Sequence, residues 1–271
     1  MLDKIIKMSR SQAEGRPRPV MLAIAGDSAS GKTTLTKGLT RALGEDRCLS
    51  ICVDDYHRYD RQERRDLPFT PLHPDCNYID IMEQHLQLLA LGRPILKPVY
   101  DHSTGRFTRP EYVEPREYVV IEGLHPLQTR LTRACFDVTV FLDPPEEIRH
   151  QWKIERDTGT RGYTREQVLT ELERREPESA AHIRPQRKHA DIVVRFAPIS
   201  GREDPPGTPL SAELLLRPTI SHPGLDTVLT DDHRTAMHLK IIRDADGTPT
   251  DCLHVHGHAS VEEAAQLEKA I

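Results

Sequence analysis

Over most of the chain, short apolar runs alternate with longer segments whose apolar residues recur every three or four positions. The short runs have the length and composition of buried strands, and the longer segments are typical of amphipathic helices. This alternation predicts an α/β fold in which a parallel sheet is covered by helices on both faces. The predicted strands are Met21–Ala25, Leu49–Val53, Tyr118–Ile121, Val138–Leu142 and Ile192–Phe196; the predicted helices are Lys32–Leu43, Ile79–Leu91, Glu146–Asp157 and Thr164–Arg175.

The pattern changes after residue 197, where Pro198, Pro205, Pro206 and Gly207 interrupt it. We therefore expect a flexible leader over residues 1–19, a main domain over 20–197, a linker over 198–208 and a small β-rich C-terminal extension over 209–271 that could extend the main sheet. In this extension we expect strands at Leu214–Leu216, Thr227–Leu229, Met237–Ile242 and Leu253–Val255, a tight turn at Ala245–Gly247 and a closing helix at Val261–Ile271.

Composition narrows the class of protein. Lysine and arginine total 37 against 42 acidic residues, so the net charge of −5 gives no general reason to expect a nucleic-acid partner. No apolar run is long enough to cross a membrane, and residues 1–19 lack a signal-peptide core, which predicts a cytoplasmic protein. The five cysteines form no CxxC pair, so reduced thiols are expected. His254, His256 and His258 alternate, which favours a solvated strand face over a metal cluster.

One motif carries chemistry on its own. Gly26 to Thr33 reads Gly-Asp-Ser-Ala-Ser-Gly-Lys-Thr, a complete P-loop motif between a predicted strand and a predicted helix. Its glycines let backbone N–H groups surround a phosphate chain at a helix N-terminus, while the lysine meets the terminal phosphates and the threonine a magnesium ion. We therefore predict a P-loop NTPase-type sheet that binds ATP and Mg²⁺. The expected nucleotide contacts are Gly26, Asp27, Ser28, Ala29, Ser30, Gly31, Lys32, Thr33 and Thr34.

Acidic residues follow two predicted strands, where ligands bind in open α/β sheets. Asp54 and Asp55 come after the second strand, and either could orient and deprotonate a hydroxyl, or cap the next turn. Glu122 ends the third strand, where a magnesium-ordering acid is expected; the alternative is an acid that faces solvent.

Cationic segments suggest an anionic substrate. Arg61 and Arg64 belong to a charged run that could equally be a solvated loop. On the later helix, Lys153, Arg156 and Asp157 share one face, and Arg161 follows between two glycines, as in a lid that closes over phosphates. The alternative is a helix end whose cations complement the dipole. The Lys97–His102 segment, with Tyr100 and His102, is interpreted as a proline-stiffened loop that could form the wall of a polyol site.

Several motifs together resemble the phosphoribulokinase and uridine kinase family of P-loop kinases, and more closely its phosphoribulokinases of the plant and cyanobacterial type. They are Asp-Asp-Tyr-His (54–57), Glu-Gly-Leu-His-Pro (122–126), Trp-Lys-Ile-Glu-Arg-Asp (152–157) and Pro-Gln-Arg-Lys-His-Ala-Asp (185–191). Uridine kinases usually carry tyrosine in place of His57. The resemblance runs from about Val20 to Ala197.

The resemblance implies roles for these residues. Asp54 resembles the family's catalytic base, acting on the C1 hydroxyl of ribulose 5-phosphate. His57, Arg61 and Arg64 correspond to sugar-phosphate contacts, Glu122 to the magnesium-associated acid and Asp157 to a second functional carboxylate. The cationic substrate and transition-state contacts correspond to Lys153, Arg156 and Arg161.

The expected activity is therefore ATP-dependent phosphorylation of ribulose 5-phosphate to ribulose 1,5-bisphosphate, a Calvin cycle reaction, with a homodimer as the expected assembly. A uridine or cytidine kinase and a kinase for another pentose phosphate remain alternatives. A non-catalytic nucleotide-binding protein is disfavoured, because Asp54, Glu122 and Asp157 are all present.

One P-loop position departs from the light-regulated members of the family. Those enzymes hold a cysteine in the P-loop that pairs with another near the end of the second strand. This chain has Ser30 in the first place, although Cys52 remains in the second. We therefore expect no thioredoxin-type regulation.

Overall fold

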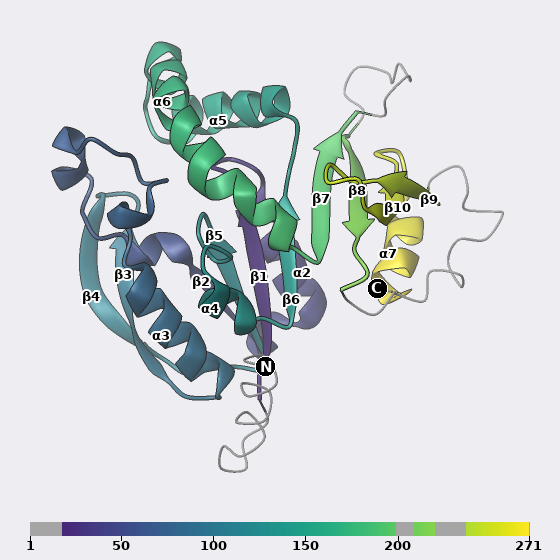
Figure 1. The fold of residues 1–271 in the computed structure, drawn as a ribbon, viewed down its shortest axis with the longest axis horizontal. Coiled ribbons are helices and arrows are strands. Elements are labelled where there is room, and N and C mark those ends of the chain that lie inside the picture. Colours follow the sequence, from purple (N-terminus) through teal and green to yellow (C-terminus); the bar gives the residue numbers. More distant parts are fainter. Residues whose placement is uncertain (1–17, 199–208, 220–236, 271) are drawn as a thin grey trace.

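The computed structural model describes residues 18–198, 209–219 and 237–270. Its main feature is an eight-stranded sheet in the order β2-β5-β1-β6-β7-β8-β10-β9 (Figure 1). The first five strands in this order are parallel and the last three antiparallel. They are β2 (Cys48–Cys52), β5 (Tyr118–Gly123), β1 (Val20–Gly26), β6 (Val138–Leu142), β7 (Ile192–Ala197), β8 (Ser211–Leu216), β10 (Pro249–Val255) and β9 (Met237–Arg243).

The helices of the main domain lie on both faces of this sheet. They are α2 (Lys32–Leu43), α3 (Ile79–Ala90), α4 (Arg130–Ala134), α5 (Glu146–Thr160) and α6 (Arg165–Glu178), and α7 (Val261–Ala270) follows the last strand. None of the described helices is long and apolar enough to span a membrane.

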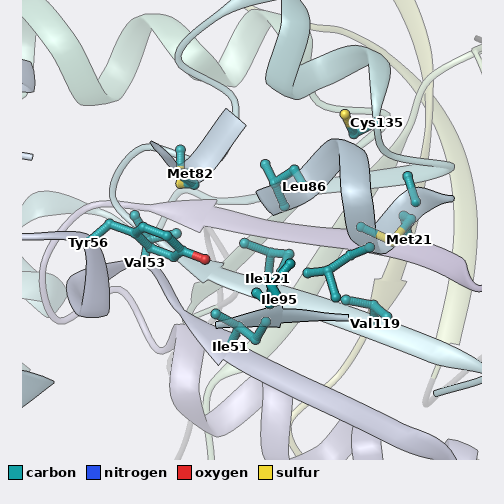
Figure 2. Packing of buried hydrophobic residues seen from close by; sticks show 12 residues of the cluster. Met21, Ile51, Val53, Tyr56, Met82, Leu86, Ile95, Val119, Ile121 and Cys135 are labelled. Atoms are coloured by element: carbon teal, nitrogen blue, oxygen red, sulfur yellow. The ribbon is translucent and has the colours of Figure 1, made fainter. Parts of the chain in front are cut away.

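Alternate residues of β1 point to opposite faces of the sheet and build two cores. Met21 packs with Ile121 of β5 and with Leu86 of α3; Figure 2 shows this cluster. Ile24 faces the other way, into a cluster that Leu35 of α2 joins. The predicted arrangement of helices on both faces is therefore confirmed.

The carboxyl ends of the parallel strands position the candidate site. β1 ends at Gly26, β2 at Cys52 and β5 at Gly123, so the loops that follow them start at one edge of the sheet. The helices α5 and α6 lie at this edge, at the top of Figure 1.

The segment Lys97–His102 is not a loop, so that prediction was wrong. Most of it belongs to β3 (Ile95–Asp101), which pairs antiparallel with β4 (Arg106–Val113) in a separate two-stranded ribbon. Pro98 is tolerated because the pairing shifts register between Lys97 and Val99, where its missing N–H interrupts no regular ladder. Only His102 lies in the turn that joins the two strands.

The C-terminal strands continue the main sheet, because β8 pairs antiparallel with β7. The Ala245–Gly247 turn joins β9 to β10, as predicted. The strand predicted at residues 227–229, the linker from residue 199 onward and residues 1–17 of the leader lie outside the described residues. The division into domains stays a prediction.

The expectation of a solvated histidine face was wrong for His254 and His256, whereas His258 is exposed as expected. His254 and His256 are buried, with His238 of the neighbouring strand opposite His254. Their rings pack on one another at centroid distances of 4.7–5.1 Å, which removes much of their surface from water.

Candidate active site

The P-loop adopts a backbone that requires its two glycines. Gly26 has φ of 151° and Gly31 of 97°, in a region that favours glycine. A Cβ on Gly26 would also lie 2.7 Å from Ser30 Oγ and 2.9 Å from Leu142 O. The loop is therefore drawn tightly against the end of β6, and α2 starts directly behind it with its free N–H groups.

Two side chains hold this loop in shape. Lys32 Nζ donates to Gly26 O at 3.0 Å and to Asp27 O at 2.7 Å. Burial lowers the pKa of Lys32, although Asp27, Asp54 and Glu122 oppose the shift. The Asp27 carboxylate accepts from Ser28 N at 2.6 Å and from Ser179 Oγ, which ties the loop to the turn after α6. Asp27 therefore faces the protein and engages the Ser28 N–H, while the N–H groups at the start of α2 are left for phosphate.

A hydroxyl and a carboxylate lie together beside the loop. Thr33 Oγ1 is 3.1 Å from both Glu122 oxygens, so the first turn of α2 and the end of β5 meet there. Glu122 is buried, and this burial raises its pKa. These oxygen donors are of the type that Mg²⁺ prefers.

The structure separates the two acids that follow β2. Asp55 accepts from Lys97 Nζ at 2.5 Å and from Tyr100 N at 2.9 Å, so it fixes β3 to the main domain. Asp54 makes neither contact. Its carboxylate lies 3.9 Å from His57 Nε2 and 3.6 Å from His102 Nε2. Asp55 is therefore engaged in holding the β3–β4 ribbon, whereas the Asp54 carboxylate faces two imidazoles.

Basic side chains surround Asp54. Burial alone would raise its pKa, but these neighbours outweigh burial and hold the pKa below its ordinary value. They are His57, His102, Lys32 and Arg64. Arg161 of the distant segment also interacts electrostatically with Asp54. The charges of the P-loop lysine, the charged run and the segment after α5 thus all act on one carboxylate.

His57 is held by Asn77, a residue that sequence reasoning missed. Its Nδ1 lies 2.7 Å from Asn77 Oδ1, while Asn77 Nδ2 donates to Pro71 O and His73 O, each at 3.0 Å. Asn77 Oδ1 must then accept, so His57 carries its proton on Nδ1. Burial lowers the pKa of His57, which leaves Nε2 an acceptor that faces Asp54 at neutral pH.

The arginines of the charged run contact the β3–β4 ribbon. Arg61 Nη2 donates to His102 O at 2.5 Å. Arg64 donates to Tyr100 Oη, and its guanidinium lies 5.1 Å from the centre of that ring. Arg64 Nη1 is buried without a hydrogen-bond partner in the described structure. Arg64 therefore offers an unused charged donor near Asp54, as an anion site requires.

The predicted lid cations converge on Asp157. Its carboxylate binds Lys153 Nζ at 2.7 Å, Arg156 Nε at 2.8 Å and Arg161 Nη1 at 3.4 Å. Burial would raise the pKa of Asp157, but Arg156 and Lys153 lower it to about 2, so it stays ionised. Burial and Arg175 lower the pKa of Lys153 to about 8. Lys153 is fully buried beside Ser28 and α6, while Arg156 and Arg161 are partly exposed.

Sequence reasoning also missed Arg149. It is buried, donates to Ser28 O at 3.2 Å and lies 3.7 Å from Asp27 Oδ1, so it supports the P-loop from α5. Helical spacing could have revealed it, because Arg149, Lys153 and Asp157 recur every four residues on one face.

Comparison with known proteins now identifies the family. The model of the Phosphoribulokinase / Uridine kinase family matches residues 21–200. The chain belongs to this family. The matched region agrees with the range from Val20 to Ala197 over which the sequence motifs resemble it.

Members of the family with both names are similar to this chain. A phosphoribulokinase of Synechocystis sp. is 43% identical over 187 residues, covering 69% of this chain and 56% of that protein. A chloroplastic phosphoribulokinase of Spinacia oleracea is 34% identical, covering 66% and 49%. A uridine kinase of Deinococcus deserti is 30% identical, covering 74% and 97%. The chain thus spans about half the length of the curated phosphoribulokinases it matches.

A solved member of the family has the same fold. The phosphoribulokinase from Rhodobacter spheroides superposes with a TM-score of 0.66 at 20% identity, covering 93% of this chain and 95% of that one. Because this alignment extends beyond residues 20–197, it includes strands of the C-terminal part.

Proposed function

We propose that this chain transfers the γ-phosphate of ATP to the C1 hydroxyl of ribulose 5-phosphate, giving ribulose 1,5-bisphosphate and ADP. The observation that carries the proposal is the position of Asp54, an ionised carboxylate coupled to the P-loop Lys32 and surrounded by His57, His102 and Arg64. Phosphoryl transfer to a hydroxyl needs a carboxylate that orients the hydroxyl, and an acceptor that already carries a phosphate needs cations to bind that phosphate. The similar proteins named phosphoribulokinase support this choice.

Asp54 acts mainly by orienting the attacking hydroxyl. Its pKa lies below the ordinary value, so it is an anion throughout the neutral range and accepts the hydroxyl hydrogen bond. The proton passes to Asp54 as the bond to phosphorus forms, which suits the loose transition state of phosphoryl transfer. Lys32 and Arg161 offset negative charge on the transferred phosphoryl group. Asp157 positions Arg161 and its neighbour Arg156.

The nucleotide and its metal fit the donors around the P-loop. Thr33 and Glu122 would hold Mg²⁺, which supplies neutralising charge to the phosphates when bound. The phosphate chain binds against the backbone of Gly26 to Thr34, at the N–H groups that are free where α2 starts. A cytoplasmic location and a homodimer stay predictions.

A uridine or cytidine kinase is the second candidate, because family members with the first name are also similar. A nucleoside acceptor is neutral and gives Arg61 and Arg64 no anion to bind. The buried, unpartnered Nη1 of Arg64 favours the phosphorylated acceptor, since a buried charged donor without a partner is costly.

The direct test is ADP release with ribulose 5-phosphate, ribose 5-phosphate and uridine, assayed side by side with MgATP. We expect saturable turnover with ribulose 5-phosphate. Turnover with uridine alone would refute the assignment, and turnover with ribose 5-phosphate alone would move it to another pentose phosphate.

Asn77 provides a test of the acceptor side. Asn77→Ala should raise KM for the acceptor about 5- to 30-fold, because the loss of a buried hydrogen bond costs about 1–2 kcal/mol. Asn77→Asp should instead move the acid limb of the pH–rate profile upward, since a carboxylate beside His57 raises the pKa of that imidazole. Ring ¹⁵N shifts of His57 report its tautomer. Identical pH profiles for the two variants would show that Asn77 does not set the state of His57.

The cysteines give a second test. All five are free thiols, and burial raises the pKa of Cys52 well above its usual range, with Asp54 and Glu122 adding to the shift. Together with Ser30 in the P-loop, this predicts that adding or removing a dithiol leaves activity unchanged. A large, reversible gain of activity on adding a dithiol would contradict the prediction.

A further inference from the structure

Three donors of different chemistry converge where β2 ends and the β3–β4 turn approaches it. They are the Cys52 thiol, the Asp54 carboxylate and the His102 imidazole, and one ligand atom of each lies within 4.8 Å of the others. We propose that these residues bind a thiophilic divalent cation, with Zn²⁺ as the best fit, and that the bound ion inhibits the enzyme. Within the described ranges, no other group of histidine, cysteine and acidic residues meets the same spacing.

The spacing is close to that of a tetrahedral ion. Bonds of about 2.0–2.3 Å place the ligand atoms of zinc roughly 3.3–3.6 Å apart. His102 Nε2 and Asp54 Oδ2 are already 3.6 Å apart. The His102 side chain is 49% exposed and lies in the turn of the ribbon, so a change of its rotamer can bring it toward Cys52. Three protein ligands leave the fourth position to water.

The donor set distinguishes this site from the magnesium site. Thiolate and imidazole favour zinc, whereas Mg²⁺ prefers oxygen ligands and retains its water. Thr33 and Glu122, which would hold Mg²⁺, supply only oxygen. On binding, Cys52 releases its proton to solvent and Sγ bonds to the metal, so no oxidant or reductant is needed. Thiolate and carboxylate together balance the two charges of the ion.

Inhibition follows from the identity of one ligand. This step rests on the proposed function, in which Asp54 accepts the hydrogen bond of the acceptor hydroxyl. A metal-bound Asp54 can no longer do so, and the ion would lie beside His57 and His102, whose Nε2 atoms are 3.9 Å and 3.6 Å from the same carboxylate. We therefore expect the acceptor and Zn²⁺ to compete, while ATP binding at the P-loop remains.

The experiment measures binding and inhibition separately. The full chain, kept reduced with a phosphine, is titrated with Co²⁺ as a spectroscopic probe and with Zn²⁺ in a competition assay against a chromophoric chelator. Cys52→Ser is compared with Cys48→Ser, a matched control at the other end of β2. We expect one equivalent of metal and a thiolate-to-Co²⁺ charge-transfer band in the parent chain and in Cys48→Ser. Cys52→Ser should lose the band and weaken Zn²⁺ binding at least ~10- to 100-fold, since losing even an outer partner costs that much.

Each remaining outcome decides the proposal. Unchanged metal binding in Cys52→Ser would overturn it. Loss of binding only in His256→Ala would also overturn it, because the site would then lie among His238, His254 and His256. Binding is read without any acceptor, so it stands even if ribulose 5-phosphate is not the substrate. A Cys52-dependent site that leaves turnover unaffected at saturating Zn²⁺ would refute the inhibition.

Discussion

Asp54→Asn is expected to lower kcat by about 10²–10⁴-fold while ATP affinity stays near that of the parent chain. The amide keeps the shape of the side chain but removes the anion that orients the attacking hydroxyl and takes its proton. Lys32 and the Thr33–Glu122 pair are untouched, so nucleotide binding has no reason to change. Steady-state kinetics and a nucleotide-binding titration measure the two effects separately.

Asp55→Asn is the matched control, because it changes the neighbouring acid in the same way. Asp55 holds Lys97 and Tyr100 of the β3–β4 ribbon, so we expect a lower Tm and a higher KM for the acceptor, with a much smaller effect on kcat. If Asp54→Asn turned over at a near-normal rate, or if Asp55→Asn lost more kcat than Asp54→Asn, the assignment of the base would be wrong.

Asp157→Asn is expected to destabilise the fold by about 3–5 kcal/mol, because it leaves buried Lys153 without its counter-charge. Lys153 is only 2% exposed, whereas Arg156 and Arg161 can turn toward solvent and should contribute little. The folded pKa of Asp157 is about 2, below its ordinary 3.8. Its stabilising contribution is therefore complete above pH 3.8 and is lost as the pH falls toward 2. Urea unfolding against pH measures both effects.

A double variant separates stability from function. Lys153→Met combined with Asp157→Leu removes both buried charges and should recover most of the lost stability, since apolar replacements of a buried ion pair are often neutral. Activity should stay low, because Arg156 and Arg161 lose the carboxylate that positions them. If the double variant were as unstable as Asp157→Asn, the unpaired charge of Lys153 would not be the cause of the lost stability. Recovery of activity in the double variant would contradict the positioning role of Asp157.

The regular elements of the main domain could be read from periodicity. α2 and β6 have the predicted bounds, and the other predicted elements of the main domain differ by at most a few residues at either end. This succeeded because each apolar strand is followed by a helix whose apolar face covers the sheet, so local pattern and tertiary packing agree. The P-loop could also be predicted from the sequence, because its glycines are required by the backbone conformation of the loop itself.

The features that could not be predicted from the sequence depend on contacts between distant segments. Pro98 made the segment of β3 look like a loop, and the pairing of β3 with β4 is what makes this segment a strand. The residue pattern does not separate Asp54 from Asp55, and it is the contacts of Asp55 with Lys97 and Tyr100 that distinguish them. Asn77 lies 20 residues from His57, so no spacing rule connects the two. In each case the role of the side chain is set by a partner that folding supplies.

The most direct test of the central claim compares ribulose 5-phosphate with ribulose, which differ only in the phosphate that the cations are proposed to bind. We predict that the parent chain prefers the phosphorylated sugar in kcat/KM by at least ~10²-fold, because each charged hydrogen bond contributes about 1.5–3 kcal/mol. Arg64→Ala should reduce this ratio by lowering turnover of the phosphorylated sugar alone. Equal kcat/KM for the two sugars would contradict the account.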